Sequence, residues 1–225
     1  MQDVINKILY IVIIITTIYN IMASVYNKCS NIMVYLIIAF IIFMCLKIYL
    51  DSEHYNLKCV ISTVDGEKYC VRERNKLKPA ANLLAKVTEK CTTLVDYMKE
   101  KYPNDDAVKK LYTNFNPSKI SETLPTSEFT AYSENKGEKL AFCLNKKKDD
   151  ETKLIDLNTL TFVAIHELSH IMTKEEGHKL IFWQNFKFLL ENAKAINIYT
   201  PEDYKKENKE YCGMTITDNP YYDLE

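Results

Sequence analysis

The chain has 225 residues, of which 47% are hydrophobic and 26% are charged, so it is long enough to bury a core of its own. Four glycines and six prolines are too few for a collagen-like, linker-rich or glycine-rich chain. Residues 1–50 contain three lysines and one aspartate, so residues 51–225 keep 26 basic and 29 acidic residues, a net charge of about −3. Because phosphate contacts need clustered positive charge, this balance argues against general nucleic-acid binding.

The first 50 residues are predicted to anchor the chain in a membrane. Residues 32–46 carry no charge, which predicts a transmembrane helix over residues 32–50, the alternative being a buried core helix. Such a helix would rise about 28 Å, close to the thickness of a bilayer core. Residues 8–25 form another apolar stretch, which predicts a first span; the alternative is a signal peptide, with Lys7 before the stretch and small residues near its end. We therefore expect a membrane anchor over residues 1–50, contact with a lipid bilayer and a membrane location, on a side that the charges do not fix.

Residues 51–225 are predicted to form a compact α+β domain with mostly antiparallel strands. Strand-like runs around turn residues predict two hairpins, one pairing 57–63 with 68–74 and the other pairing 129–133 with 139–144. The spacing of apolar residues predicts helices between Pro79 and Pro103 and over 105–112, 158–173 and 178–197, with Asn158 as the cap of the third.

Seven cysteines are present, and none forms a CxxC pair. The simplest interpretation is free, mostly buried thiols in a reducing compartment. Cys59 and Cys70 flank a predicted hairpin turn, so a cross-strand disulfide is the alternative for these two residues.

His166-Glu167-Leu168-Ser169-His170 is an HExxH motif inside a predicted apolar helix. Positions i and i+4 of a helix share a face, so His166 and His170 can offer two imidazole nitrogens to one metal ion. Glu167 is the predicted general base, because it can reach a water molecule at an open metal position. Zinc binding is favoured over a structural role, since unpaired imidazoles and a carboxylate are costly in an apolar helix.

A catalytic zinc site needs a third protein ligand and a vacant fourth position. We expect His178 to be the third ligand, because Gly177 lets the chain turn and His178 then starts the next helix, facing back. Glu191 on that helix is the alternative.

Other residues near the motif have weaker predicted roles. Tyr132 and Tyr211 are candidates for stabilising the oxyanion of a peptide under attack. Strand 139–144 is a candidate edge for pairing with an extended substrate, the alternative being an interior strand. Phe182 and Trp183 are expected to pack beneath His178 without touching substrate. The partners of the free imidazole nitrogens are left open, with Asp156 and Asn158 as the nearest polar residues before the motif.

The motif and the residues after it resemble the HExxH…HxxxFW pattern of small zinc peptidases related to the WLM and SprT-like groups. The resemblance is closest to a predicted metallopeptidase family of large DNA viruses, and it extends over roughly residues 68–220 through five short segments: Ala80–Ala85, Thr130–Tyr132, Asn135–Gly137, Asn158–Leu160 and Tyr211–Met214. It implies a gluzincin-like core, with His166, His170 and His178 as zinc ligands and Glu167 as the catalytic residue.

Three functions follow from these observations. The leading hypothesis is a membrane-anchored zinc endopeptidase that acts on a protein or peptide substrate. The first alternative is a non-catalytic, zinc-stabilised membrane or virion component, in which Glu191, Cys143 or Cys212 closes the fourth position. The second is a DNA–protein crosslink protease, which the resemblance suggests and the acidic charge opposes. The sequence leaves the substrate and the oligomeric state open.

Overall fold

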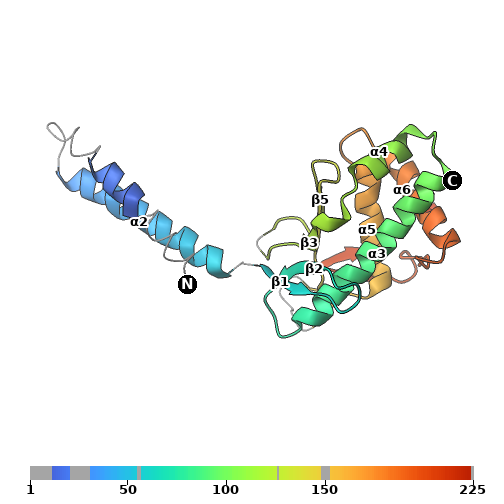
Figure 1. The fold of residues 1–225 in the computed structure, drawn as a ribbon, viewed down its shortest axis with the longest axis horizontal. Coiled ribbons are helices and arrows are strands. Elements are labelled where there is room, and N and C mark those ends of the chain that lie inside the picture. Colours follow the sequence, from blue (N-terminus) through green and yellow to red (C-terminus); the bar gives the residue numbers. More distant parts are fainter. Residues whose placement is uncertain (1–11, 21–30, 55–56, 126, 148–152, 224–225) are drawn as a thin grey trace. The chain divides into compact units, whose positions relative to one another are not determined.

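The computed structural model of the protein describes residues 12–20, 31–54, 57–125, 127–147 and 153–223 (Figure 1). The chain divides into two compact units, Met1–His54 and Tyr55–Glu225, and each is described by itself.

The first unit contains a helix over residues 12–20 and helix α2 (Asn31–His54). Within the described residues, no helix has both the length and the hydropathy needed to cross a bilayer. The spans predicted over 8–25 and 32–50 are therefore not supported. Residues 8–11 and 21–25 of the first predicted span, including the small residues of a signal peptide, lie outside the described part of the chain. The membrane location stays a prediction.

The second unit is a mixed α+β domain with three small sheets. Its strands are β1 (Leu57–Ile61), β2 (Lys68–Arg72), β3 (Ile120–Glu122), β4 (Ala131–Glu134), β5 (Lys139–Phe142), β6 (Lys209–Tyr211) and β7 (Met214–Ile216). The pairs β1–β2, β4–β5 and β6–β7 are antiparallel, whereas β3 pairs with β5 in parallel. The two predicted hairpins are confirmed. Strand β3 was not predicted, because three residues are too few to show a period of two.

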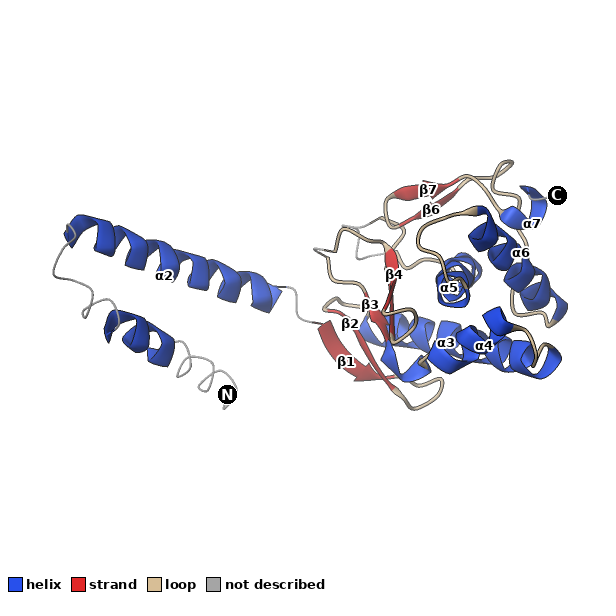
Figure 2. Ribbon diagram, turned by 90° about the horizontal axis from the view of Figure 1, so that it is seen from above, coloured by secondary structure: helices blue, strands red, loops and turns tan. Residues whose placement is uncertain are grey.

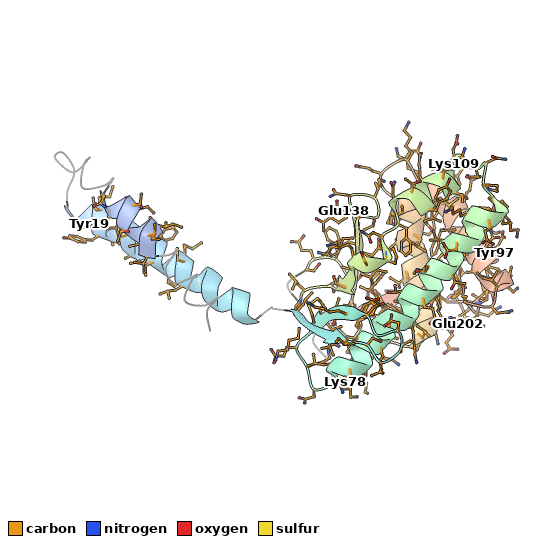
Figure 3. The ribbon with its side chains drawn as sticks, viewed as in Figure 1. Tyr19, Lys78, Tyr97, Lys109, Glu138 and Glu202 are labelled. Atoms are coloured by element: carbon orange, nitrogen blue, oxygen red, sulfur yellow. A yellow bond between two sulfur atoms is a disulfide. The ribbon has the colours of Figure 1, made fainter. Side chains whose placement is uncertain are left out.

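The helices of this unit are α3 (Leu77–Lys101), α4 (Asp106–Asn114), α5 (Leu157–Met172), α6 (Leu180–Ala195) and α7 (Pro220–Asp223), with a short 3₁₀ turn at Pro117–Lys119. Figure 2 shows α5 in the middle of the unit, with α3 and α4 on one side and α6 on the other, and contacts join α5 to all three. Helix α5 is therefore buried nearly all round, as its apolar sequence requires. Charged side chains of the same unit, such as Lys78, Lys109 and Glu138, point outward (Figure 3).

A buried charged cluster joins β2 to β3. Arg74 Nη2 forms an ion pair with Glu122 Oε1, and the backbone N–H of Arg72 donates to Glu122 Oε2 at 2.7 Å. Arg72 Nε also donates to the carbonyl oxygen of Thr123 at 2.7 Å. Because Glu122 is only 1% exposed, its carboxylate depends on these partners for the solvation that water would otherwise provide.

Two disulfides tie the strands together. Cys59–Cys70 crosses the β1–β2 hairpin, and Cys143–Cys212 joins the end of β5 to the turn between β6 and β7. The expectation of free thiols is therefore wrong for these four residues, whereas Cys91 is buried and free. Cys143 and Cys212 are far apart in sequence and have no paired spacing, so only the fold brings them together.

Candidate metal centre and cleft

Helix α5 carries the HExxH motif through the core. Its first turn is capped by Asp156, whose side chain accepts hydrogen bonds from the backbone N–H of Thr159 at 2.9 Å and from Thr159 Oγ1 at 2.8 Å. The prediction of Asn158 as the cap is wrong: Asn158 Nδ2 donates instead to the carbonyl oxygen of Thr200 at 2.9 Å. Neither Asp156 nor Asn158 has a hydrogen bond to the motif's histidines among the described contacts.

The imidazoles of His166, His170 and His178 converge on one point. His166 Nε2 lies 3.2 Å from His170 Nε2 and 3.2 Å from His178 Nε2, and the ligand atoms of all three lie within 4.8 Å of one another. His166 Nε2 has either one in-plane lone pair or one N–H, so a hydrogen bond can explain one of these approaches but not both. Two nitrogens that bind a tetrahedral zinc ion at 2.0–2.1 Å would lie about 3.3 Å apart. The donor set and its spacing therefore fit zinc.

His178 lies in the loop between α5 and α6, two residues before α6 begins, and not in the helix as predicted. Gly177 has φ +76°, so the expected turn is present at this position. Trp183 Nε1 donates to the backbone carbonyl of His178 at 3.1 Å, and Lys136 Nζ donates to the carbonyls of Thr173 and Glu175 at the start of the loop. These bonds hold the loop where His178 reaches the other two histidines.

Glu191, the alternative third ligand, is exposed on α6 and does not belong to the histidine cluster. Cys143 and Cys212, the thiols considered for a fourth ligand, are bonded to each other. Among the described residues, no further His, Cys, Asp or Glu joins the three histidines. The cluster therefore has the three-ligand composition of a catalytic zinc site, not the four-ligand composition of a structural one.

An aromatic layer supports the three rings. The ring of Phe182 lies 4.9 Å from His166, 4.3 Å from His170 and 4.7 Å from His178, measured between centroids. Phe182 is fully buried, so its predicted packing role is confirmed. Such packing limits the rotation of the imidazoles and keeps their nitrogens directed to a common point.

Burial also fixes the charge of the site in the metal-free protein. Desolvation, with the neighbouring imidazoles adding to it, lowers the pKa of His166 to about 3; desolvation and His178 lower the pKa of His170 to about 4. Both rings are therefore neutral at pH 7 and their nitrogens can bind a cation. Burial raises the pKa of Glu167 to about 8, and this side chain is only 5% exposed. A cation bound beside Glu167 would favour its ionised form.

A cleft of about 290 Å³ opens beside His166 and Glu167. Residues of α5 and α6 form one side of the cleft, the helical wall. Thr130, Ala131 and the lining residues between 211 and 218, in and after the β6–β7 hairpin, form the other side, the strand wall. The lining residues are Thr130, Ala131, Phe162, Val163, His166, Glu167, Trp183, Phe186, Tyr211, Met214, Ile216, Thr217 and Asp218. The ring of Trp183 lies 5.7 Å from that of His178, as its predicted packing role requires, and the same side chain also lines the cleft.

Of the two tyrosines considered for stabilising the oxyanion, one lies at the cleft and the other does not. Tyr211 lines the cleft, and its Oη donates to the carbonyl oxygen of Thr130 at 3.2 Å. Tyr132 does not line the cleft; its ring lies 6.3 Å from that of Phe129, and its Oη accepts from Lys139 Nζ at 3.4 Å. The strand 139–144, considered as the edge beside the cleft, contains β5, the central strand of its sheet; β3 and β4 are the two edge strands.

Sequence reasoning assigned no cleft role to Met214, Ile216 or Ala131. The segments Thr130–Tyr132 and Tyr211–Met214 carried a signal only through the family resemblance. No local pattern could reveal them, because they reach the cleft through contacts between segments about 80 residues apart, such as the hydrogen bond from Tyr211 to Thr130.

Comparisons with known proteins give viral relatives. No family model matches the chain. Uncharacterized protein R325 of Acanthamoeba polyphaga mimivirus is 27% identical over 187 residues, which cover 81% of this chain and 91% of the relative. Uncharacterized protein 136R of Invertebrate iridescent virus 6 is 36% identical over 70 residues, 31% of this chain and 38% of the relative. The crystal structure of Wss1 from Saccharomyces cerevisiae aligns with a TM-score of 0.42 and 17% identity, covering 56% of this chain and 84% of Wss1.

Proposed function

We propose that the protein is a zinc-dependent endopeptidase. The observation that carries this proposal is the convergence of three imidazole nitrogens beside a buried glutamate at the head of a cleft. The resemblance of the motif to WLM and SprT-like peptidases supports the same reaction class. His166, His170 and His178 would hold the zinc ion, which would supply Lewis acidity toward a peptide carbonyl and make a neighbouring water molecule more acidic.

Glu167 is the proposed general base and acid. It follows His166 directly on α5 and lines the same cleft, so its carboxylate faces the space where a peptide would lie. In the reaction, Glu167 accepts a proton from water while the water oxygen bonds to the carbonyl carbon. As the C–N bond breaks, Glu167 gives that proton to the leaving amine. The low solvent exposure of Glu167 keeps bulk water away from this proton.

The shape of the site supports a peptide as substrate. Strand β4 is an edge strand of its sheet, and Ala131, its first residue, lines the cleft together with Thr130. An extended peptide can add to such an edge through main-chain hydrogen bonds. The non-catalytic alternative has no observation in its favour, because the residues considered for a closed fourth position lie outside the cluster or are bonded to each other.

The test is proteolysis of a broad peptide library by the zinc-loaded full chain, read by mass spectrometry. Wild type should cleave, and Glu167→Gln should cleave about 10²- to 10⁴-fold more slowly while retaining zinc. Glu191→Gln is the matched control, since it changes an exposed glutamate on α6 and should leave the rate unaltered. Equal rates for wild type and Glu167→Gln, or full activity without zinc, would contradict the proposal.

A further inference from the structure

The cleft has a direction relative to the catalytic pair. Phe162 and Val163 precede His166 and Glu167 by four residues on α5, so the two pairs lie on the same helix face, one turn apart. The cleft therefore runs from Glu167 toward the start of α5, within about 6 Å along the helix axis. A side chain on a residue next to the bond that is cut would enter this part of the cleft.

Apolar side chains reach the cleft from both walls. Trp183 and Phe186 contribute rings from α6, with the ring of Phe186 5.1 Å from that of Phe162 between centroids, and Met214 and Ile216 line the same cleft from β7. Met214 is 48% exposed in the absence of a ligand, although it is a large apolar residue beside a cleft. Covering this surface with an apolar group would be favourable, at about 25 cal/mol for each Å² removed from water.

The charged side chains among the described residues that line the cleft are acidic. Glu167 and Asp218 are its carboxylates, and no lysine or arginine is found among the described residues that line it. Asp218 has a cation nearby, because Lys205 Nζ lies 4.0 Å from its Oδ1. An acidic side chain packed against Trp183, Met214 or Ile216 would still lose its water without gaining a basic partner from the described lining residues, and this loss of solvation is costly. This arrangement disfavours aspartate and glutamate in a substrate at this position.

The strand wall is held in place before any ligand binds. The Cys143–Cys212 disulfide, a hydrogen bond from the backbone N–H of Cys212 to the carbonyl of Asn145 at 3.0 Å and another from Gly213 to Lys146 at 2.9 Å all fix the turn next to Met214. Thr130 Oγ1 also donates to Met214 Sδ at 3.3 Å. A peptide that binds to an already ordered wall causes little further loss of conformational entropy in the protein. Such a wall can distinguish side chains by size and polarity.

We propose that this cleft selects peptides by a large apolar side chain, such as leucine, methionine or phenylalanine, that packs between Trp183 and Met214 beside the bond that is cut. This inference rests on the proposed peptidase function and adds its substrate class. It also gives Trp183 two roles, since the same side chain holds the carbonyl of His178.

The first test is cleavage of peptides that differ at a single position next to the cut. Leucine, methionine or phenylalanine at that position should raise kcat/KM at least about tenfold over alanine, and aspartate or glutamate should give the lowest values. Met214→Lys should lower kcat/KM for the leucine peptide about tenfold and raise it for the glutamate peptide. Ile61→Lys is the control, because Ile61 is equally apolar and 65% exposed on β1, away from the cleft. Equal rates for leucine, alanine and aspartate peptides would overturn the inference while leaving the peptidase function intact.

The second test reads binding without cleavage. Trp183 is the only tryptophan of the chain and lines the cleft, so tryptophan fluorescence reports on this side of the cleft. Titration of the Glu167→Gln protein with tetrapeptides should change the emission in a saturable way with a leucine peptide and not with an aspartate peptide. The same result from both peptides would overturn the inference. If wild type cleaves nothing, the proposed function fails, and this titration still decides whether the cleft takes an apolar side chain.

Discussion

The two walls of the cleft are built by different kinds of interaction. The helical wall takes its three histidines and Glu167 from the thirteen residues 166–178, so the site is assembled by one helix and the loop that follows it. The strand wall takes its residues from two segments about 80 positions apart, joined by the hydrogen bond from Tyr211 to Thr130. The Cys143–Cys212 disulfide adds a link through Cys143, whose backbone N–H donates to the carbonyl oxygen of Thr130 at 2.8 Å. In the proposed reaction the helical wall would therefore carry the chemistry, and the strand wall would shape the space around it.

This difference predicts how each wall responds to substitution. Replacing a ligand on the helical wall removes a metal contact but leaves the helix packed. Replacing a residue that supports the strand wall removes a contact between distant segments, which lowers the free energy of unfolding. The following predictions test this contrast on the metal-free protein, where zinc binding does not add to stability.

The largest effect is expected at Glu122, in the buried charged cluster that joins β2 to β3. Glu122→Gln would leave the guanidinium groups of Arg72 and Arg74 buried without a carboxylate, and we expect a loss of about 3–5 kcal/mol in urea unfolding. Glu134→Gln is the control, because the Glu134–Lys139 pair is exposed and should contribute about 0–1 kcal/mol. Similar losses for the two variants would show that the buried cluster does not support the sheet.

The two disulfides should differ in their effect. Cys143 and Cys212 are 69 residues apart and Cys59 and Cys70 are 11 apart, so loop entropy assigns about 4 kcal/mol to the first bond and about 3 kcal/mol to the second. Unfolding of the paired Cys→Ser variants in urea measures both values. After zinc is added back, the Cys143→Ser/Cys212→Ser protein should in addition lose selectivity for apolar substrates, whereas Cys59→Ser/Cys70→Ser should keep it. The contrast fails if removal of the shorter link affects selectivity more.

A smaller effect is expected at Gly137, where the turn between β4 and β5 meets the end of α4 and helix α5. Gly137 has φ +117°, and a Cβ there would lie 2.7 Å from the carbonyl oxygen of Asn114 and 2.9 Å from Ile171 Cδ1 on α5. Gly137→Ala should cost about 2–3 kcal/mol, since it adds a clash to backbone strain. Gly66→Ala is the matched control: φ is +76° and the space is open, so thermal unfolding should show only the strain of about 1 kcal/mol. Equal losses of stability for the two variants would mean that Ile171 on α5 and the carbonyl of Asn114 shift to accommodate the added Cβ at little cost.

The smallest effect is expected at the start of the helical wall. Asp156→Ala removes the cap of α5 and should cost about 1 kcal/mol, while Asp156→Asn keeps an acceptor and should cost a few tenths. Both values come from urea unfolding. If neither variant loses stability, burial of α5 alone fixes the beginning of the helix.

The helical wall could be predicted from sequence because its signals are local. HExxH spacing, the apolar residues around it and a histidine after Gly177 each depend on neighbours within a few turns, and the structure brings His166, His170 and His178 together as expected. The errors on this wall are small: the cap is Asp156, and His178 precedes α6. Helix ends are fixed by single hydrogen bonds, which apolar periodicity does not contain.

The strand wall could not be predicted, because its signals are long-range. The hairpins were predicted from turn residues, but the position of β5 between β3 and β4 depends on pairing across the domain. The Cys143–Cys212 bond was missed for the same reason, since spacing in sequence says nothing about two cysteines brought together by a sheet and a distant hairpin. Apolar content alone also led to two membrane spans, although the described helices do not meet the requirements for crossing a bilayer.

We propose that the three histidines bind one zinc ion and that His178 is the third ligand. The decisive experiment is the zinc content of wild type, His178→Ala and Glu191→Ala after dialysis, measured by mass spectrometry of the metal. We expect one zinc ion per chain in wild type and in Glu191→Ala, and a loss of nearly all zinc in His178→Ala with the fold retained by circular dichroism. Full zinc content in His178→Ala, or its loss in Glu191→Ala, would show that His178 is not the third ligand.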